Sequence, residues 1–462
     1  MLADGEGSPG EWTRCPAWHR IFVVFTPCPQ DAPIMNEPSA TLAYDGKTVE
    51  LPLVRSTEGD CGIDVTSLRA KTGWITFDPG FANTGACKSG ITHIDGERGL
   101  LRYRGYPLEQ LAERASFVET AMLLMFGELP ARDELAEFRG MLRDQELLHE
   151  GLLKHLDGFP PLGQPMAILS AMINALGSYY PELLNIRTDA EYRLAAAKIM
   201  SKVRTIAAFS FRTADGLPLM YPNPHMDYCR NFLHMMFSVP FRLYEPPAPI
   251  VRALSLFFIA HADHGLDTSC ATVRMVGSSQ ANLFASISAA ICALWGRLHG
   301  GAGVGVVEMF EEIRDGRNTA TNLLEEVKAG RRRLMGFGQR VYKCYDPRAL
   351  LIRKAYENLL SAGMARRDPL YDIALEIEGL TQNDGFFLER RLFPNVNFYS
   401  GLLLRAINIP VPMFPVMIAI GNMPGFIAHW HEEWKDTEMK IHRPRQVYTG
   451  KNQRDYTPMD KR

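Results

Sequence analysis

The sequence predicts a mainly α-helical protein with a short β-rich region near its N-terminus. From Pro107 onward, apolar residues recur at spacings of three and four, which is the period of a helix with one buried face. Leu108, Leu111 and Ala112 begin this pattern. Between about residues 41 and 94, turn signals alternate with short apolar runs instead. We therefore expect a large helical body preceded by a small β region.

The β region contains a hairpin signal. Tyr44-Asp45-Gly46-Lys47 separates two short runs, residues 41–43 and 49–51, and Asp-Gly suits a tight turn because both residues tolerate positive φ angles. Further turns are expected at residues 77–80 and 94–97, which contain Asp-Pro-Gly and Asp-Gly. These signals predict short strands joined by tight turns.

Short breaks rich in proline or glycine divide the helical body, for example at residues 159–161 and 245–247. Such breaks end helices because proline lacks a backbone donor and glycine is flexible. After a first stripe at 108–125, helices are expected at residues 132–156, 164–179, 190–211, 227–237, 249–261, 281–297, 303–314, 348–362, 370–379 and 399–406.

Composition narrows the possible functions. The chain has 462 residues, is 46% hydrophobic and carries a net charge of −2 at pH 7, so nothing in its charge favours a nucleic-acid partner. We find no uninterrupted apolar run of about 18 residues that would predict a membrane span. The eight cysteines form no Cys-x-x-Cys pair. We therefore expect reduced thiols, no zinc site and a cytoplasmic protein.

Residues 1–34 differ in character from the rest of the chain. They mix Gly, Pro, Trp and Cys without periodicity, and the apolar run at 21–25 is too short for a signal peptide. We expect this stretch to be disordered, or to be an upstream extension if translation begins at Met35.

The segment 331–348 gives the strongest indication of a ligand. It gathers arginines and a lysine around a Gly-Phe-Gly turn, with the neutral amide of Gln339 at its centre. Glycine allows backbone N–H groups to approach phosphate oxygens closely, so the segment suits a polyanion. On charge alone, such a run is more often a solvated surface. The residues predicted to bind a coenzyme-like polyanion are Gly336, Gly338, Arg340 and Lys343.

Four other segments are dense in side chains that catalysis and binding use. They are His261-Ala262-Asp263-His264, residues 294–303, residues 393–401 and residues 440–446. The first has two histidines three apart, but no third ligand follows at a telling spacing, so we predict no metal. In the second, His299 stands beside a glycine-rich helix start, where it would stay neutral and donate to an oxyanion. A packing or capping role for that histidine stays open.

Taken together and in this order, these segments resemble the citrate synthase family, in its bacterial type with a small N-terminal β region. The likeness runs from about Thr41 to Arg462 and includes motifs at residues 77–80, 231–237, 261–264 and 443–450. It implies the citrate synthase fold: a large helical domain and a smaller, mobile helical domain that closes over the cleft. The implied divisions are a β-rich region at 35–94, a large domain at 95–298 with 400–462, and a small domain at 299–399.

The resemblance also implies ligands and an assembly. Acyl-CoA would be the cosubstrate, a 2-oxo acid or related carbonyl compound the acceptor, and no cofactor would be tightly bound. The protein would form a homodimer or a hexamer, without nucleic acid or membrane as partner.

Four site residues of the family are matched here. His264 matches a histidine that binds oxaloacetate, and His299 matches the one that stabilises the enolate. Arg348 and Arg443 match two arginines that bind carboxylates, with Arg443 reaching across the dimer. The resemblance therefore implies an intact part of the substrate site.

Three other positions depart from the family. Gln339 stands where the family has its second catalytic histidine, and Asn397 stands where it has the catalytic aspartate. Asn422 stands where it has a third carboxylate-binding arginine. Each change replaces an ionisable side chain by a neutral amide.

The departures bear directly on the chemistry. A carboxamide is a far weaker base than a carboxylate, so Asn397 cannot abstract the proton next to the thioester carbonyl. A general base typically accelerates such a proton transfer ~10²–10⁴-fold. Asn422 removes a charge-assisted pair worth roughly 1.5–3 kcal/mol to an anionic substrate. Asp267 adds an acid where the family has an amide. Either the base has moved to Asp267, or this residue only caps a helix.

Three functions remain open from the sequence. The first is an acyl-CoA enzyme of the citrate synthase type that works on a different acceptor. The second is a non-catalytic paralogue that keeps the fold and ligand binding for regulation. The third is an active citrate synthase that uses acetyl-CoA and oxaloacetate.

Overall fold

The computed structural model describes residues 22–24 and 39–462. It separates into two compact units. The first contains the described residues up to Lys88 together with Pro444–Arg462, and the second is Ser89–Arg443. Apart from Phe22–Val24, the expectation for residues 1–34 lies outside the described residues.

The first unit is built on a four-stranded antiparallel sheet in the order β1-β2-β3-β4. Its strands are β1 (Phe22–Val24), β2 (Ser39–Tyr44), β3 (Lys47–Arg55) and β4 (Cys61–Ile63), followed by helix α1 (Leu68–Thr72). Tyr44 pairs with Lys47 across the β2–β3 turn. Asp45 and Gly46 both have positive φ, 46° and 73°, as a tight two-residue hairpin turn requires. The predicted hairpin is therefore confirmed.

The second unit begins with a small antiparallel sheet. It contains β5 (Thr92–Asp95), β6 (Leu100–Tyr103) and β7 (Tyr106–Pro107). The predicted turn at 94–97 joins β5 to β6, and Asp95 Oδ1 accepts the backbone amides of Glu97 and Arg98 at 3.1 and 2.9 Å.

Helices make up the rest of the second unit, so the prediction of a mainly α protein is confirmed. They are α2 (Leu108–Arg114), α3 (Phe117–Phe126), α4 (Arg132–Asp144), α5 (Glu150–Leu156), α6 (Pro165–Tyr179), α7 (Asp189–Ala214), α8 (Tyr228–Phe237), α9 (Ala248–Ala260), α10 (Thr268–Gly277), α11 (Leu283–Leu294), α12 (Ala302–Arg314), α13 (Ala320–Lys328), α14 (Pro347–Ser361), α15 (Pro369–Gln382), α16 (Gly385–Glu389), α17 (Val396–Ala406) and α18 (Phe414–Lys435).

Local sequence explains many of the helix starts. Ser116 and Glu119 form a capping box at the start of α3, and Thr188 and Glu191 form another at α7. In each box the hydroxyl accepts one free amide and the carboxylate accepts another, which satisfies backbone donors that the first helical turn leaves open.

Among the described residues, five helices escaped the sequence prediction: α1 in the first unit, and α10, α13, α16 and α18 in the second. The long helix α18 is buried around nearly its whole circumference, so it shows no polar face and no clear helical period. It also contains Gly421 and Pro424, which suggest a break. By length and hydropathy α18 could cross a membrane, but 89% of its most apolar window is buried inside the protein, as in a core helix.

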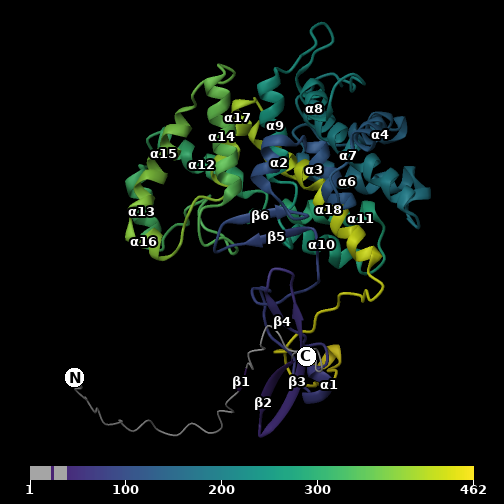
Figure 1. Ribbon diagram of the computed structural model, residues 1–462, viewed down its shortest axis with the longest axis vertical. Coiled ribbons are helices and arrows are strands. Elements are labelled where there is room, and N and C mark those ends of the chain that lie inside the picture. Colours follow the sequence, from purple (N-terminus) through teal and green to yellow (C-terminus); the bar gives the residue numbers. More distant parts are fainter. Residues whose placement is uncertain (1–21, 25–38) are drawn as a thin grey trace. The chain divides into compact units, whose positions relative to one another are not determined.

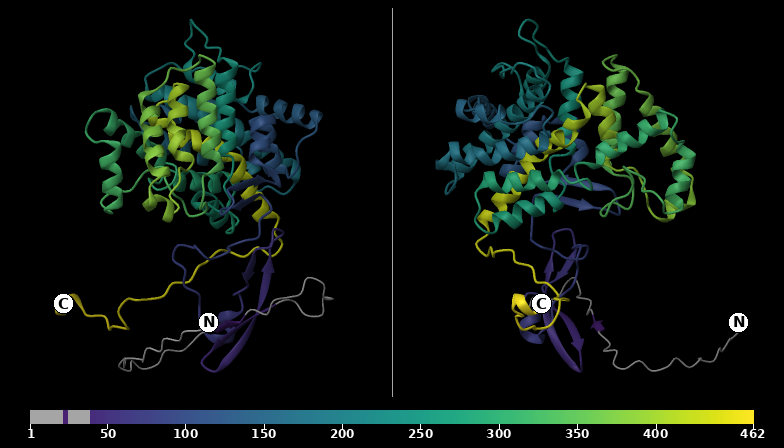
Figure 2. Two further views of the ribbon diagram at one scale, coloured as in Figure 1. Left: turned by 60° about the vertical axis from the view of Figure 1, so that its left-hand side comes forward. Right: turned by 180° about the vertical axis from the view of Figure 1, so that it is seen from behind.

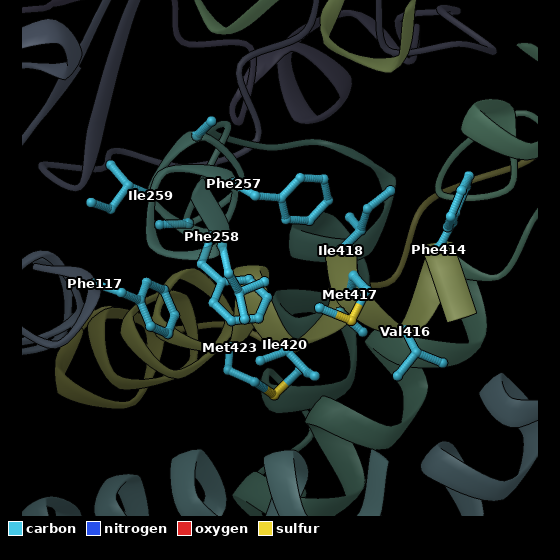
Figure 3. Packing of buried hydrophobic residues seen from close by; sticks show 14 of the residues in the cluster. Phe117, Phe257, Phe258, Ile259, Phe414, Val416, Met417, Ile418, Ile420 and Met423 are labelled. Carbon is cyan, nitrogen blue, oxygen red and sulfur yellow. The ribbon is translucent and has the colours of Figure 1, made fainter. Parts of the chain in front are cut away.

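The core of the second unit forms around α18. This helix packs against α3, α7, α9, α10 and α11, and its yellow ribbon runs among other helices in Figure 1 and in both views of Figure 2. Figure 3 shows Met417, Ile420 and Met423 of α18 close to Phe258 of α9. All four side chains are fully buried. This packing fixes the end of α9, where the His261–His264 motif begins.

Helices α12 to α16 gather on one side of the second unit in Figure 1. They fall within residues 299–399, the predicted small domain, whose boundaries and motion stay a prediction. Residues 444–462, which we expected in the large domain, lie in the first unit.

Candidate functional site

The Gly-Phe-Gly turn is held by the strand-like segment before α17. Gly338 N donates to Phe393 O and Asn395 N donates to Gly336 O, both at 2.8 Å. Gly336 and Gly338 have φ of 78° and 65°, a conformation that glycine adopts without strain. A Cβ at Gly336 would lie 2.9 Å from atoms of Phe398. Glycine is therefore required there by conformation and by space.

Asp346 connects the turn to α14 and α17. Its Oδ2 accepts the side-chain amide of Gln339 at 3.0 Å and the backbone amide of Val396 at 3.1 Å. Arg348 binds it with Nε at 3.1 Å and Nη2 at 2.9 Å. Burial opposes ionisation of this carboxyl, but Arg348 holds its pKa below the usual range. Asp346 therefore keeps the buried Arg348 charged and orients Gln339.

Glu378 of α15 provides a second anchor for the same region. This buried carboxylate accepts the hydroxyls of Tyr345 at 2.6 Å and Tyr399 at 2.5 Å, and Arg353 donates to it at 2.9 Å. Tyr345 precedes Asp346, and Tyr399 lies two residues after Asn397. The network thus ties the turn and the first part of α17 to the helices behind them.

The cations of the segment 331–348 differ in their contacts and exposure. Arg332 forms an ion pair with Glu312 at 2.5 Å, and Lys343 Nζ donates to Arg340 O at 3.0 Å. Arg331, Arg333 and Arg340 are exposed. The segment therefore presents cationic side chains at the surface beside the glycine turn, and its binding of a coenzyme stays a prediction.

His261 and His264 lie at and just beyond the end of α9. His261 Nδ1 hydrogen bonds to Phe257 O at 2.8 Å, and His264 Nε2 lies 3.4 Å from the hydroxyl of Tyr342. Burial lowers the pKa of each imidazole to about 4. Both rings are therefore neutral at pH 7. The positive charge of Arg348 contributes to this, because it also lowers the pKa of both imidazoles. Tyr342 links His264 to the basic segment.

Asp267 is the N-cap of α10. Its Oδ1 accepts the backbone amides of Ser269 and Cys270, each at 2.9 Å, and the Ser269 hydroxyl at 2.7 Å. The same oxygen is 3.6 Å from His299 Nε2. Burial raises the pKa of this carboxyl, but the nearby His299 imidazole and the hydrogen bonds from Cys270 and Ser269 outweigh burial and hold the pKa well below its usual range. Asp267 is consequently a weak base.

His299 precedes α12 in a glycine-rich turn, as expected. Its Nε2 lies 2.9 Å from Ser269 Oγ, and a quarter of its side chain is exposed. Sequence reasoning singled out Asp267 and His299 separately but missed Ser269, which bridges them. No motif marked that serine, because the bridge depends on how α10 packs beside the turn.

Asn397 lies in the first turn of α17 and is half-buried. Its backbone amide is accepted by the N-cap Asn395 at 3.0 Å, while its side chain hydrogen bonds to none of the residues that the structure describes. Its Oδ1 is 3.8 Å from where a Cβ on Gly303 of α12 would stand. Asn397 therefore approaches the helix start that His299 precedes, with a free amide.

Asn422 lies in the buried helix α18 with only 5% of its surface exposed. With the amide oriented so that its nitrogen faces the neighbouring backbone carbonyls, as those acceptors require, the nitrogen donates to Ile418 O at 2.8 Å and to His261 O at 3.0 Å. Both donor hydrogens of the amide are thus occupied by backbone carbonyls. In this arrangement Asn422 braces the end of α9 and has no hydrogen left to donate to a substrate carboxylate.

Arg443 is exposed at the end of the second unit. No ion pair joins it to an acid within residues 39–462. The structure does not bring it to the His264–Arg348 region within one chain, and its predicted reach across a dimer stays a prediction.

Three buried side chains lie close enough together to hold a metal ion: Asp263, Cys270 and His429. However, Arg274 Nε donates to His429 Nδ1 at 3.1 Å, so the proton of the neutral ring sits on Nε2. That nitrogen faces Asp263 Oδ1 at 3.2 Å, and a metal would need its lone pair. The group is therefore better described as a buried Arg–His–Asp chain that holds the 261–264 motif.

A cavity of about 670 Å³ lies elsewhere in the second unit, between the starts of α3, α8 and α9 and the middle of α7. It shares no residue with the predicted site. None of the residues singled out in the sequence motifs lines it, so we place the candidate site at the glycine turn, His264 and His299.

Comparison with solved structures first defines the class of protein. The chain is similar to citrate synthase from Pyrobaculum aerophilum, with a TM-score of 0.74 and 30% identity over 88% of this chain and 97% of that one. It is also similar to citrate synthase from Thermoplasma acidophilum in a ternary complex with carboxymethyl coenzyme A and oxaloacetate, with a TM-score of 0.76 and 26% identity over 83% and 99%. The fold is that of citrate synthases.

Sequence comparison then defines the family. Residues 80–445 match the model of the citrate synthase C-terminal domain. The chain is 47% identical to citrate synthase 1 of Mycobacterium tuberculosis over 92% of this chain and 99% of that protein. It is 44% identical to citrate synthase of Corynebacterium glutamicum over 92% and 97%. This chain belongs to the citrate synthase family.

Proposed function

We propose that this chain is a citrate synthase-type acyltransferase that condenses the enolate of an acyl-CoA with a carbonyl acceptor carrying fewer carboxylates than oxaloacetate. Membership of the family supports transfer of an acyl group with formation of a carbon–carbon bond. Acyl-CoA would be the cosubstrate without a tightly bound cofactor. We further propose a homodimer or hexamer that works in the cytoplasm.

The observation that carries the choice of acceptor is the position of Asn422. Its amide donates to two backbone carbonyls, and Arg348 is already paired with Asp346. A second carboxylate on the acceptor would lack the charge-assisted pair that an arginine gives, worth roughly 1.5–3 kcal/mol. An acceptor with one carboxylate, or none, fits this site better.

A second candidate, ordinary citrate synthesis, is favoured by the 47% identity to citrate synthase 1 of Mycobacterium tuberculosis. The amides Gln339 and Asn397 oppose it, because neither can carry a proton at neutral pH. The third candidate, a non-catalytic paralogue, is favoured by the same two amides, because Gln339 and Asn397 cannot transfer protons.

One experiment separates the three candidates. The protein is incubated in deuterated water with acetyl-CoA or propionyl-CoA, together with oxaloacetate, a monocarboxylic 2-oxo acid or an uncharged aldehyde. Thiol release and deuterium in the acyl group are measured, with heat-denatured protein as the control. We expect turnover with a monocarboxylic or uncharged acceptor at least 10-fold above that with oxaloacetate. Preference for oxaloacetate would establish the second candidate, and a lack of exchange and thiol release throughout would establish the third.

A further inference from the structure

The hydroxyl of Ser269 determines where the proton of His299 sits. Ser269 Oγ lies 2.7 Å from Asp267 Oδ1 and 2.9 Å from His299 Nε2, and a hydroxyl has one proton to donate. If that proton pointed to His299, two oxygens with lone pairs, one of them charged, would face each other at 2.7 Å. The hydroxyl therefore donates to Asp267.

His299 must then supply the proton for its own contact with Ser269. In its neutral form an imidazole carries one N–H, so in that form of His299 the proton is on Nε2 and the lone pair is on Nδ1. Nδ1 hydrogen bonds to nothing in the part of the chain that the structure describes, and a quarter of the His299 side chain is exposed. The atom that can take a proton from a ligand is therefore Nδ1.

Other candidate bases at the site are already committed. Asp267 Oδ1 accepts three hydrogen bonds, and Asp346 binds Arg348. His261 Nδ1 is occupied by Phe257 O, and burial lowers the pKa of His264 to about 4, which makes that imidazole a weak base. The remaining polar side chains that the sequence placed at the reacting centre, Gln339 and Asn397, are amides without useful basicity.

The geometry points to an exchange of roles between His299 and Asn397: His299 Nδ1 takes the proton and Asn397 donates to the enolate oxygen. Asp267 is the positioning residue, because it sets the tautomer through Ser269. This inference rests on the proposed function. It revises the sequence-based expectation that His299 donates a hydrogen bond, and of the two alternatives for Asp267 it discards the one in which Asp267 is itself the base.

The proton transfer balances without any further reactant. The C–H bond next to the thioester carbonyl breaks and an N–H bond forms at Nδ1 of His299. The electron pair of the C–H bond becomes the carbon–carbon double bond of the enolate, and the negative charge moves to its oxygen. Asn397 can donate an N–H to that oxygen, and the Asp267 carboxylate, 3.6 Å from Nε2, stabilises the imidazolium.

The test has a structural readout that does not depend on turnover. The full-length protein is labelled with ¹⁵N-histidine, and the ring signals of His299 are identified by their loss in His299→Gln. We expect Nε2 protonated and Nδ1 unprotonated in the wild type. In Ser269→Ala the preference should be lost, because Nε2 of His299 then no longer has the hydroxyl oxygen that accepts its proton. A wild-type His299 with its proton on Nδ1 would overturn the inference.

The second readout is deuterium exchange into the acyl group of acetyl-CoA. We expect Asp267→Asn to lower the exchange rate by ~10²-fold or more, the usual scale of general-base catalysis. Asp315→Asn, which removes an exposed acid paired with Arg314 and Arg317, should leave the rate unchanged. If Asp267→Asn exchanged deuterium as fast as the wild type, the inference would be refuted and the proposed function would stand. Absence of exchange and thiol release in the wild type would refute both.

Discussion

Asp346 and Arg348 form a buried ion pair two residues apart, in which the guanidinium Nε and Nη2 bind the two carboxylate oxygens at 3.1 and 2.9 Å. Asp346 is fully buried and Arg348 is 6% exposed. Asp346 also accepts hydrogen bonds from Gln339 and from Val396 at the start of α17. The pair therefore joins the basic segment to the candidate site.

Removing one partner should be costly. We predict that Asp346→Asn lowers the free energy of unfolding by about 3–5 kcal/mol, because Arg348 is left buried without its counter-charge. Urea unfolding followed by circular dichroism measures this. Asp315→Asn, at an exposed ion pair, serves as the matched control and should change stability by less than ~1 kcal/mol. Equal effects of the two substitutions would contradict the assignment of Asp346 as a structural hub.

Gly336 should tolerate no side chain. We predict that Gly336→Ala destabilises the protein by roughly 2–4 kcal/mol, since its φ is 78° and an added Cβ would lie 2.9 Å from both Phe398 and Val306. Gly330→Ala is the control, because that glycine has φ of 70° but nothing within 4 Å of an added Cβ. It should cost only the backbone strain, about 1–2 kcal/mol. Thermal unfolding of the two variants separates packing from strain.

Stability should fall between pH 7 and pH 5. The folded pKa of His261 is about 4 against an ordinary value of 6.5, so the unfolded chain binds the proton more readily. The stabilisation by the neutral ring is complete above pH 6.5 and is lost as the pH falls toward 4. For His261 this amounts to about 2 kcal/mol at pH 5.

The variant His261→Gln isolates this contribution. Its amide can still donate to Phe257 O, but it does not titrate, so the loss of stability between pH 7 and pH 5 should be smaller by about 2 kcal/mol. His264 is unchanged in the variant, and because its pKa is also lowered, it still makes the protein less stable as the pH falls. Arg348 and Asp346, which also act on His261, keep their charges at both pH values. Unfolding at both pH values measures the difference, and an unchanged pH dependence would argue against a buried neutral His261.

Restoring the ionisable groups should restore reactivity toward oxaloacetate. We predict that Asn397→Asp/Gln339→His/Asn422→Arg raises oxaloacetate-dependent thiol release from acetyl-CoA by ~10²-fold or more, because it supplies a base, a proton carrier and a carboxylate partner. The same triple variant with Asn397→Gln in place of Asn397→Asp is the control, since it lacks the base. If the triple variant folds but remains inert, one of the three positions has been assigned wrongly or another substitution blocks the reaction.

Local patterns account for most of what could be predicted. The stripe predicted at 164–179 corresponds to α6 (Pro165–Tyr179) and the Asp45-Gly46 turn to a hairpin, because helical period and turn chemistry depend on neighbouring residues. The helix α18 could not be predicted in this way. Its burial on all sides removes the polar face by which a helix is recognised, and Pro424 suggests a break that the fold does not make.

By itself, the sequence determined the helical class, the β hairpin, the family and the identities of the amides Gln339, Asn397 and Asn422. Only the tertiary structure decided what those residues contact. Asn422 donates to His261, 161 positions earlier, and Ser269 joins Asp267 to His299, 30 positions later. Such partners are set by how distant helices pack, and a hydrogen bond exists only where that packing brings donor and acceptor within about 3 Å.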